Sequence, residues 1–486
     1  MLITVTGIEV VQSIQDAANS VPLFALRPTL VRIYTSVSKV ETIANISAEI
    51  EIRRKDGSLA RYGTKYPLPV SGSGGLPTQS QRHSLNLSLN FVIPSGELTE
   101  GEIEIALAKA WPTTDPGKPV EIESSLDRNA PLFTVESPTS LRCHVIGLTT
   151  FDDVTRLPNE DSVLRIKREL SEILPVSNLH FSSETKEVPP EANPPYSSER
   201  TEDGRDLEWE RKHNIICACL MASRVCDLEN GRDPRTIYYG MVADDGSLRD
   251  AAVSNVGKKA RPSIASAGPH GQQAHTYAVH EIGHVMTCLH PGHPVGTQVK
   301  NDADFPASYK GRISDETDEH FGWRAGAQGS LGEHLSYTDT FDFMSYATKT
   351  GISAINYRKV AQGLRDIEAF QPETKENGFV AVIGVYDKGK GTISGEIRHI
   401  YKTKYSIPKG EQSDKDVVIR VHRKNAKPQD FNIDLKFENS ALSPNSGPFQ
   451  ITVPYKDDIT KFELIIKRSP KDEKTYSYIR EAIRSC

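Results

Sequence analysis

The sequence predicts a multidomain α+β protein, with a central α/β domain between an N-terminal and a C-terminal β-sandwich. At 486 residues the chain is too long for one ordinary domain. Apolar and polar residues alternate in short runs near both ends, as in half-buried strands, whereas the middle combines strand-like runs with helical periodicity. We therefore place the three domains at residues 1–138, 139–373 and 374–486.

Both predicted sandwiches rest on several short strand-like runs separated by turn residues. Glycine, serine and proline gather in the N-terminal turns, for example in residues 71–77. The N-terminal strands are expected at residues 8–12, 30–34, 46–52, 84–91 and 103–107, and the C-terminal strands at 378–386, 391–397, 416–421, 449–453 and 461–466.

The central domain opens with a predicted strand at residues 141–148, and a helix follows it. Apolar residues recur at helical spacing from Val163 to Ile173, with Asp161 or Ser162 as the N-cap. Further helices are expected at residues 208–222 and after a cap at Ser353, and further strands at 236–242 and 261–267. Which of these two strands forms the edge of its sheet stays open.

Composition and charge limit the classes of binding partner that the sequence leads us to expect. The net charge of −6 and the lack of a basic block give no reason to expect nucleic-acid binding. No apolar run is long enough to span a bilayer, and we expect a monomer. Six cysteines in so long a chain do not form a spaced disulfide framework. We interpret Cys217, Cys219 and Cys226 as free thiols, with a single disulfide as the alternative that stays open.

One stretch of the central domain carries residues that suit a metal ion. If the chain is helical there, His280 and His284 lie one turn apart on the same face, and Glu281 projects beside the metal. This is the H-E-x-x-H zinc pattern, in which the glutamate is the general base. His290 is the expected third ligand, which leaves a fourth position for water, as in catalytic zinc sites. The alternative is a buried helix whose histidines bond to neighbouring groups.

The residues from His280 to His290 resemble the metzincin signature H-E-x-x-H-x-x-G-x-x-H, and Met344-Ser-Tyr346 resembles the Met-turn of that family. The resemblance implies a zincin-like α/β catalytic domain with one catalytic Zn²⁺, held by His280, His284 and His290. It also implies that Met344 forms an apolar floor under the metal. Tyr346 would donate a hydrogen bond to the developing oxyanion.

Thr287 departs from the family pattern, which has glycine at this position. That glycine lets the helix stop and swing the third histidine inward, and threonine tolerates positive φ far less well. Either the chain turns later, at Pro291-Gly292, or His293 replaces His290 as the third ligand. The offset of His290 favours His290.

Together these residues predict a zinc-dependent endopeptidase that cleaves a protein or glycoprotein substrate. Glu281 would take a proton from the attacking water and later pass it to the leaving amine. The alternatives are another zinc hydrolase, and a non-catalytic adhesin or carbohydrate-binding protein on a degenerate scaffold. The intact Glu281 argues against degeneration. His320 and His334 are expected at the surface or behind the metal ligands.

Residues 7–16 and 27–34 are similar to immunoglobulin-like modules that precede bacterial metallopeptidase domains. This similarity implies a spacer or substrate-docking role for an immunoglobulin-like N-terminal domain. The resemblance also implies an extracellular enzyme. The N-terminus lacks the features of a secretory signal, which favours cytoplasmic or toxin-like delivery instead, and both readings stay open.

Overall fold

The computed structural model describes most of the chain, in segments separated by gaps. The described residues are 2–37, 43–65, 68–70, 79–126, 130–149, 160–187, 207–242, 251–254, 260–268, 274–291, 302–318, 320–326, 330–345, 347, 349–387, 394–406, 414–433, 446–469, 472–479 and 483–484.

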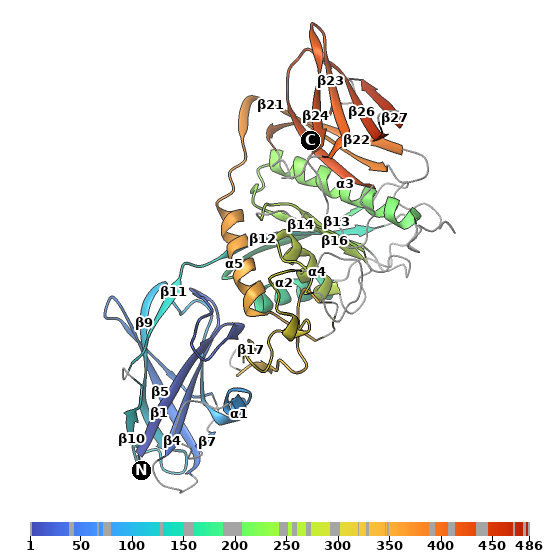
Figure 1. Ribbon diagram of the computed structural model, residues 1–486. Coiled ribbons are helices and arrows are strands. Elements are labelled where there is room, and N and C mark those ends of the chain that lie inside the picture. The colour runs from blue at the N-terminus through green and yellow to red at the C-terminus, as the bar shows by residue number, and fades with distance from the viewer. Residues whose placement is uncertain are drawn as a thin grey trace.

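The N-terminal part consists of two sheets that share one core (Figure 1). One sheet has the order β10-β1-β4-β8, with strands Glu121–Ser124, Leu2–Val11, Thr29–Val37 and Leu89–Ile93. The other has the order β3-β11-β9-β5-β6 with β7 beside β5, and its strands are Leu23–Phe24, Leu132–Glu136, Gly101–Pro112, Ile43–Arg54, Leu59–Gly63 and Leu68–Val70.

The strand predicted at residues 84–91 is wrong in its first half. The short helix α1 (Gln79–Arg82) and a 3₁₀ helix (Leu85–Leu87) precede β8, which begins only at Leu89. The Ser84 hydroxyl accepts a hydrogen bond from the backbone N–H of Asn86 and caps the 3₁₀ turn. A local side-chain bond of this kind competes with the sheet for the backbone.

A five-stranded sheet forms the middle of the molecule, in the order β13-β12-β14-β16-β15. The strands are Asn178–Glu187, Ser140–Thr149, Ile237–Val242, Ile264–Gly268 and Ala251–Ser254. The first four are parallel, and β15 pairs antiparallel with β16. Neither of the two strands considered at the sequence level is the edge near the zinc motif, because β15 occupies that place.

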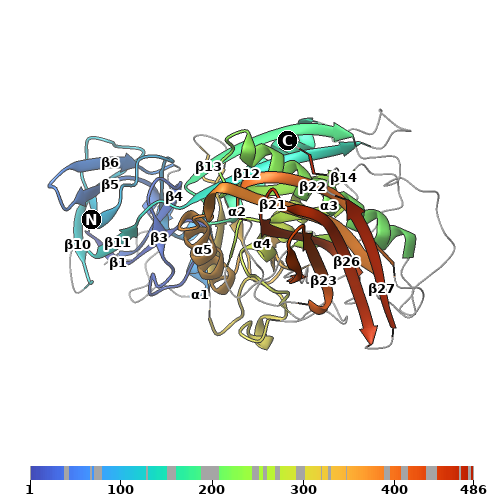
Figure 2. The ribbon, with the colours of Figure 1, turned by 90° about the horizontal axis from the view of Figure 1, so that it is seen from above.

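Helices lie on both faces of this sheet (Figures 1 and 2). On one face α2 (Glu160–Ile173), α4 (Ala274–Val285) and α5 (Ala354–Glu368) share the largest buried cluster. On the other face lies α3 (Leu207–Glu229), which is covered in turn by strand β21 (Thr374–Asp387). A helix packed on both sides has no single apolar stripe. For this reason the periodicity of α3 is weak in the sequence.

The C-terminal part forms two further sheets around a separate core. One has the order β22-β21-β25, in which β22 and β25 are Ser394–Tyr405 and Ser446–Pro454. The other has the order β24-β23-β26-β27, with strands Ala426–Ile433, Asp414–Arg423, Ile459–Ser469 and Asp472–Ile479.

Short elements connect the N-terminal and central parts. Strand β17 (Phe321–Arg324) pairs with β18 (Glu333–Leu335) on one side and with β2 (Ile14–Gln15) on the other. Between β17 and α5 lie β19 (Phe341–Asp342) and β20 (Thr350–Gly351), and a 3₁₀ helix (Ala307–Tyr309) precedes β17.

Arg27 lies buried where the two parts meet. Its guanidinium donates hydrogen bonds to the carbonyls of Leu174 and Val176, the latter at 3.2 Å, and to the Ser13 hydroxyl at 2.9 Å. Ile14, Val21 and Phe24 also belong to the same buried cluster as α2, α4 and α5. The N-terminal part therefore shares the core of the central part.

The predicted fold class, a multidomain α+β protein with a zincin-like α/β catalytic domain, is wrong. The described residues are predominantly β: they form 27 strands in seven sheets against five α-helices. Strand-then-helix alternation holds only near the start of the central region. Its longest helix is shared with a C-terminal sheet, and much of the chain from 302 to 351 is short strands and turns. None of the helices in the described segments has both the length and the apolarity needed to cross a bilayer.

Candidate metal centre

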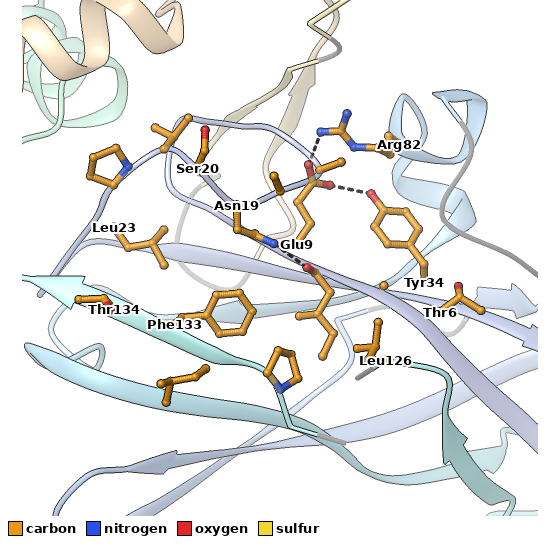
Figure 3. A pocket seen from close by; sticks show the side chains of 18 of the residues that line it. Thr6, Glu9, Asn19, Ser20, Leu23, Tyr34, Arg82, Leu126, Phe133 and Thr134 are labelled. Atoms are coloured by element: carbon orange, nitrogen blue, oxygen red, sulfur yellow. Dashed lines mark hydrogen bonds and ion pairs between the residues drawn. The ribbon is translucent and has the colours of Figure 1, made fainter. Parts of the chain in front are cut away.

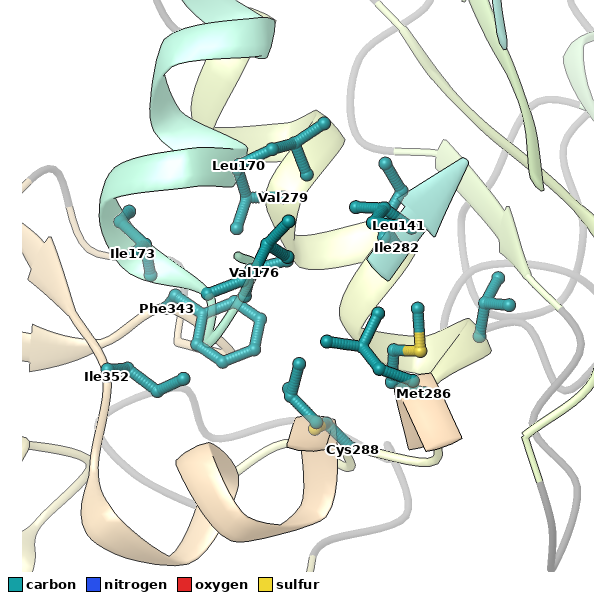
Figure 4. Packing of buried hydrophobic residues seen from close by; sticks show 14 of the residues in the cluster. Leu141, Leu170, Ile173, Val176, Val279, Ile282, Met286, Cys288, Phe343 and Ile352 are labelled. Atoms are coloured by element: carbon teal, nitrogen blue, oxygen red, sulfur yellow. The ribbon is translucent and has the colours of Figure 1, made fainter. Parts of the chain in front are cut away.

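Helix α4 positions the zinc motif from the core of the central part. Ala278, Val279, Ile282 and Val285 are buried on it, and they pack into the cluster that α2 also lines (Figure 4). Figure 4 shows Val279 and Ile282 reaching toward side chains of α2 and β12. This packing fixes the rotation of the helix and thereby the direction of the histidines between these positions.

The structure brings His280, His284 and His290 together. Their ring centroids are 4.9 Å apart for His280 and His284, 5.0 Å for His280 and His290, and 4.7 Å for His284 and His290. The Nε2 atoms of His280 and His290 are 3.1 Å apart. All three side chains are buried, with exposed fractions of 2%, 6% and 6%.

Backbone carbonyls orient two of the three rings. The Nδ1 of His280 lies 3.1 Å from the carbonyl oxygen of Phe343, and the Nδ1 of His284 lies 2.8 Å from that of Cys288. A carbonyl only accepts, so each Nδ1 carries the proton and each Nε2 keeps its lone pair. Metal-binding histidines in proteins are usually oriented in this way.

The imidazoles are held in their neutral form. Burial, helped by the charges of His284 and His290, lowers the pKa of His280 well below its usual range. Burial lowers the pKa of His284 to about 4. Burial and the charge of His284 lower the pKa of His290 to about 3. At neutral pH no proton therefore competes with a metal ion for the three nitrogens.

Helix α4 ends at Val285, and Thr287 makes the turn directly after it. Thr287 has φ of 71°, its N–H donates to the carbonyl of His284, and the Cys288 N–H donates to the carbonyl of Gly283. These two bonds make a Schellman motif with threonine in the glycine position. The chain thus turns at Thr287 itself rather than at Pro291-Gly292, and this turn brings His290 to the other histidines.

Glu281 lies beside the three histidines. It is buried, with 2% of its surface exposed, and its Oε1 is 3.8 Å from the Nε2 of His280. Tyr239 of strand β14 lies near it: burial, and next the charge of Glu281, raise the pKa of Tyr239 well above its usual range. The sequence reasoning missed Tyr239, because only the fold brings β14 under α4.

Met344 is fully buried and lies against α4. A Cβ atom added to Gly283 would come within 2.6 Å of the Met344 sulfur and within 2.5 Å of the Phe343 ring. Gly283 therefore lets the Phe343-Met344 segment approach the helix directly between its two histidines. Tyr346 and His293 lie outside the described residues.

The donor set fits a zinc ion. With Zn–N distances of 2.0–2.1 Å, nitrogens of a tetrahedral site are about 3.3 Å apart, close to the 3.1 Å between the Nε2 atoms of His280 and His290. Three neutral imidazoles and no protein carboxylate among them match a three-ligand zinc site.

A second cluster, His144, Glu184 and Asp227, is less suited to a metal. Its carboxylates already bind cations: the Lys186 Nζ is 2.7 Å from Glu184, and the Arg232 Nε is 3.0 Å from Asp227. These two positive charges would repel a metal ion. The cluster is an ion-pair network that ties β12 and β13 to α3.

Other predicted residues lie away from the metal centre. His320 is bonded to Ser314, 3.3 Å from its hydroxyl, and the His334 ring stacks on Phe321 with centroids 4.7 Å apart. Cys217 is a buried thiol, and neither Cys217 nor Cys219 forms a disulfide, as predicted. The same prediction for Cys226 is wrong, because Cys226 is disulfide-bonded.

A cavity of about 1110 Å³ lies in the N-terminal part, away from the three histidines (Figure 3). Glu9 on its wall accepts hydrogen bonds from Arg82 at 2.5 Å, from the Tyr34 hydroxyl at 2.7 Å and from Arg32 at 3.1 Å. The carboxylate is thus already satisfied by the protein. We assign this cavity no role in the chemistry of the metal centre.

Comparisons with known proteins add no support to the candidate metal centre, which therefore rests on the geometry of its residues. No protein-family model matches the chain, and no curated protein matches it. A solved structure of a β-glucuronidase from glycoside hydrolase family 2 aligns with 98% of this chain at 6% identity and a TM-score of 0.16. The chain spans 63% of the length of that structure. A likeness this weak supports neither a fold nor a function.

Proposed function

We propose that this protein is a zinc-dependent endopeptidase that acts on a protein or glycoprotein substrate. The observation that carries the proposal is the convergence of three buried, neutral imidazoles next to the buried carboxylate of Glu281. A closed structural zinc site would need a fourth protein ligand, and no fourth ligand joins this cluster among the described residues.

The residues of this chain have separate tasks in the proposed reaction. A zinc ion bound by the three histidines would supply Lewis acidity toward a peptide carbonyl and lower the pKa of water. Glu281 would accept the proton of the attacking water and deliver it to the leaving amine. The carbonyls of Phe343 and Cys288 hold the ligand rings in place throughout.

Strand β15 offers a place for the substrate backbone. Among the described residues it is one of the two edge strands of the central sheet, and it contacts α4. An extended peptide that pairs with such an edge receives main-chain hydrogen bonds without regard to its side chains. Binding there would place successive peptide bonds beside the zinc helix, as an endopeptidase requires.

The test compares wild type with Glu281→Gln. Purified wild type should contain about one zinc per chain and cleave an unfolded generic protein, with loss of cleavage after chelation and recovery on zinc addition. Removing the general base should lower the cleavage rate by about 10²–10⁴-fold. Zinc content, measured by atomic emission, should stay unchanged because Glu281 is not a ligand.

Glu160→Gln, which changes an exposed glutamate at the start of α2, is the matched control and should cleave like wild type. A wild-type protein that holds zinc but cleaves no peptide, while hydrolysing small esters or amides, would assign the centre to another class of zinc hydrolase. A wild-type protein that binds no zinc would end the proposal.

A further inference from the structure

Asp342 is a buried carboxylate that the proposed chemistry does not use. It lies at the end of β19 with no exposed surface, directly before the segment that approaches α4. Its Oδ1 accepts hydrogen bonds from the Met344 N–H at 2.9 Å and from the Asn356 amide at 2.8 Å. Its Oδ2 accepts the Ser353 N–H at 2.8 Å.

These bonds join two structural elements. Met344 belongs to the turn under the metal centre, whereas Ser353 and Asn356 belong to the start of α5. The backbone of Asp342 adds two further bonds: its carbonyl accepts the Ser345 N–H at 2.8 Å, and its N–H donates to Gly311 at 2.9 Å. The turn is therefore held by the Asp342 side chain and backbone together.

The same turn presents a carbonyl to the metal centre. Phe343 lies between Asp342 and Met344, whose N–H binds the Asp342 carboxylate, and the Phe343 carbonyl oxygen is the partner of the His280 Nδ1. That carbonyl and the Met344 N–H belong to one planar peptide unit, so the hydrogen bond from Met344 to Asp342 fixes the direction of both groups. A change at Asp342 thus reaches the His280 ring through one covalently connected segment.

A buried carboxylate with this many partners needs a reason to be there. Burying an ionisable group is costly unless hydrogen bonds compensate for the lost water, and burial raises the pKa of Asp342 although the bonds from Ser353, Met344 and Asn356 oppose the shift. An apolar residue would fill the space without this cost. It would not accept the hydrogen bonds that Met344, Ser353 and Asn356 donate to the Asp342 carboxylate.

We infer that Asp342 is a positioning residue for the metal centre: its carboxylate locks the turn whose Phe343 carbonyl orients His280. The inference rests on the proposed zinc site. Asp342 itself touches neither the metal position nor the substrate.

The test is zinc affinity, measured by competition with a chromophoric chelator, together with the visible spectrum of the cobalt-substituted protein. Asp342→Asn keeps the shape but turns one acceptor oxygen into a donor, which faces the N–H of either Met344 or Ser353. We expect zinc to bind 10- to 100-fold more weakly, as is usual when a group behind a metal ligand is lost. The cobalt spectrum should change in intensity because the ligand geometry changes.

Val360→Ala is the matched control. Val360 is fully buried on the same helix α5, so its loss destabilises the same region without touching the turn. Its thermal unfolding temperature should fall while zinc affinity and the cobalt spectrum stay as in wild type. If Asp342→Asn does not fold, Asn356→Ala is the deciding variant, because it removes one hydrogen-bond donor to the Asp342 Oδ1 and leaves the Asp342 charge in place. Its zinc affinity should be about threefold weaker than that of wild type.

Zinc affinity and a cobalt spectrum equal to wild type in the folded Asp342 variant, or in Asn356→Ala if it must decide, would overturn the inference while leaving the zinc site intact. The inference would also be overturned if Val360→Ala weakened zinc binding as much as Asp342→Asn does, because general destabilisation would then explain both losses. A wild-type protein that binds no zinc removes the proposed function and this inference together.

Discussion

Thr287 holds a conformation that its side chain resists. A β-branched residue at φ of 71° costs about 1–3 kcal/mol, yet the turn at this point is what brings His290 to the metal centre. The strain is local, and the bonds from Thr287 and Cys288 to the preceding turn of α4 keep it in place. Selection for the site thus tolerates a residue that is poor for the backbone.

Thr287→Gly should therefore stabilise the protein. Relief of the left-handed strain exceeds the entropy that glycine adds to the unfolded chain, and we expect a gain of about 1 kcal/mol in the free energy of unfolding. Urea denaturation measures it. Thr276→Gly, inside the helical part of α4, should lose about 1 kcal/mol instead. Equal losses in both variants would show that Thr287 is not strained.

The ligands of the metal centre follow from spacing alone, but their supports do not. His280 and His284 are one helical turn apart in any helix, and the offset of His290 predicts its approach. The Phe343 carbonyl, Tyr239 and Asp342 come from other elements, so their positions depend on tertiary packing. A signal for Asp342 was present: an aspartate two residues before Met344 is placed to accept its N–H in an Asx-turn.

At the scale of elements, periodicity located the helices that have one exposed face. The helix predicted from Val163 to Ile173 is α2, although it begins at Glu160, before either proposed cap. The predicted cap of α5 is confirmed, because the Ser353 hydroxyl accepts the Asn356 N–H. The helix predicted at 208–222 runs on to Glu229, since both faces of α3 are covered and no polar face marks its length.

Three side chains, from strands β17, β18 and β4, stack on one another, which makes the stability of this region depend on pH. The His334 ring lies parallel to Phe321, and the Arg32 guanidinium lies 3.8 Å from the centroid of the same Phe321 ring. Burial, followed by the positive charges of Arg32 and His83, lowers the pKa of His334 to about 4. Protonation would place a second cation against Phe321 beside Arg32.

In His334→Phe the free energy of unfolding should decrease less than in wild type as the pH falls. The folded pKa of about 4 lies below the ordinary 6.5, so the unfolded chain takes up the proton first and stability is lost as the pH falls from 6.5 to 4. After allowance for solvent screening, the variant should lose about 1–2 kcal/mol less than wild type between pH 7 and 4.5. Urea unfolding in a chelator buffer measures this. His180→Phe, at an exposed position of β13, should follow wild type, and parallel curves for all three proteins would contradict the assignment.

At the scale of the whole molecule, the N-terminal part is joined to the central part by buried contacts and not only by the chain. The Tyr357 hydroxyl on α5 donates to the buried Gln12 side chain at 3.4 Å. At the surface, Arg365 adds an exposed ion pair with Glu136. Phe24 packs near the Tyr357 ring, with centroids 5.9 Å apart. A freely tethered spacer, one of the two roles that resemblance implied, would not need these contacts.

Arg27→Met should weaken this junction. The change removes the guanidinium donor from the carbonyls of Leu174 and Val176, although Leu174 keeps the hydrogen bond from the Val176 N–H. We expect a loss of about 2–4 kcal/mol in the free energy of unfolding. Thermal unfolding and limited proteolysis at the junction measure it. Arg53→Met, at a side chain that is 59% exposed in the same sandwich, should stay within about 0.5 kcal/mol of wild type. Equal behaviour of the two variants would mean that the buried contacts of Arg27 add nothing to the junction.

The fold class was the part of the structure that the sequence predicted worst. The resemblance covers the residues from His280 to Tyr346 and says nothing about the size of the surrounding sheets. The pairing of β2 with β17 joins segments that are far apart in sequence, and no local pattern encodes such a partner. Motif spacing is set by short-range geometry, whereas the number of sheets is set by long-range pairing.

Ile14 pairs with Gly322, more than 300 positions along the chain. A ribosome adds about 5–20 residues per second, so the first strands wait for many seconds before this partner leaves the exit tunnel. Tyr357 and Arg365 emerge later still. During synthesis the nascent chain therefore exposes the surface that Ile14, Val21 and Phe24 later bury. The candidate metal centre, with Asp342 and Phe343 behind His280, can therefore assemble only after all residues from Ile14 to Phe343 have been synthesised.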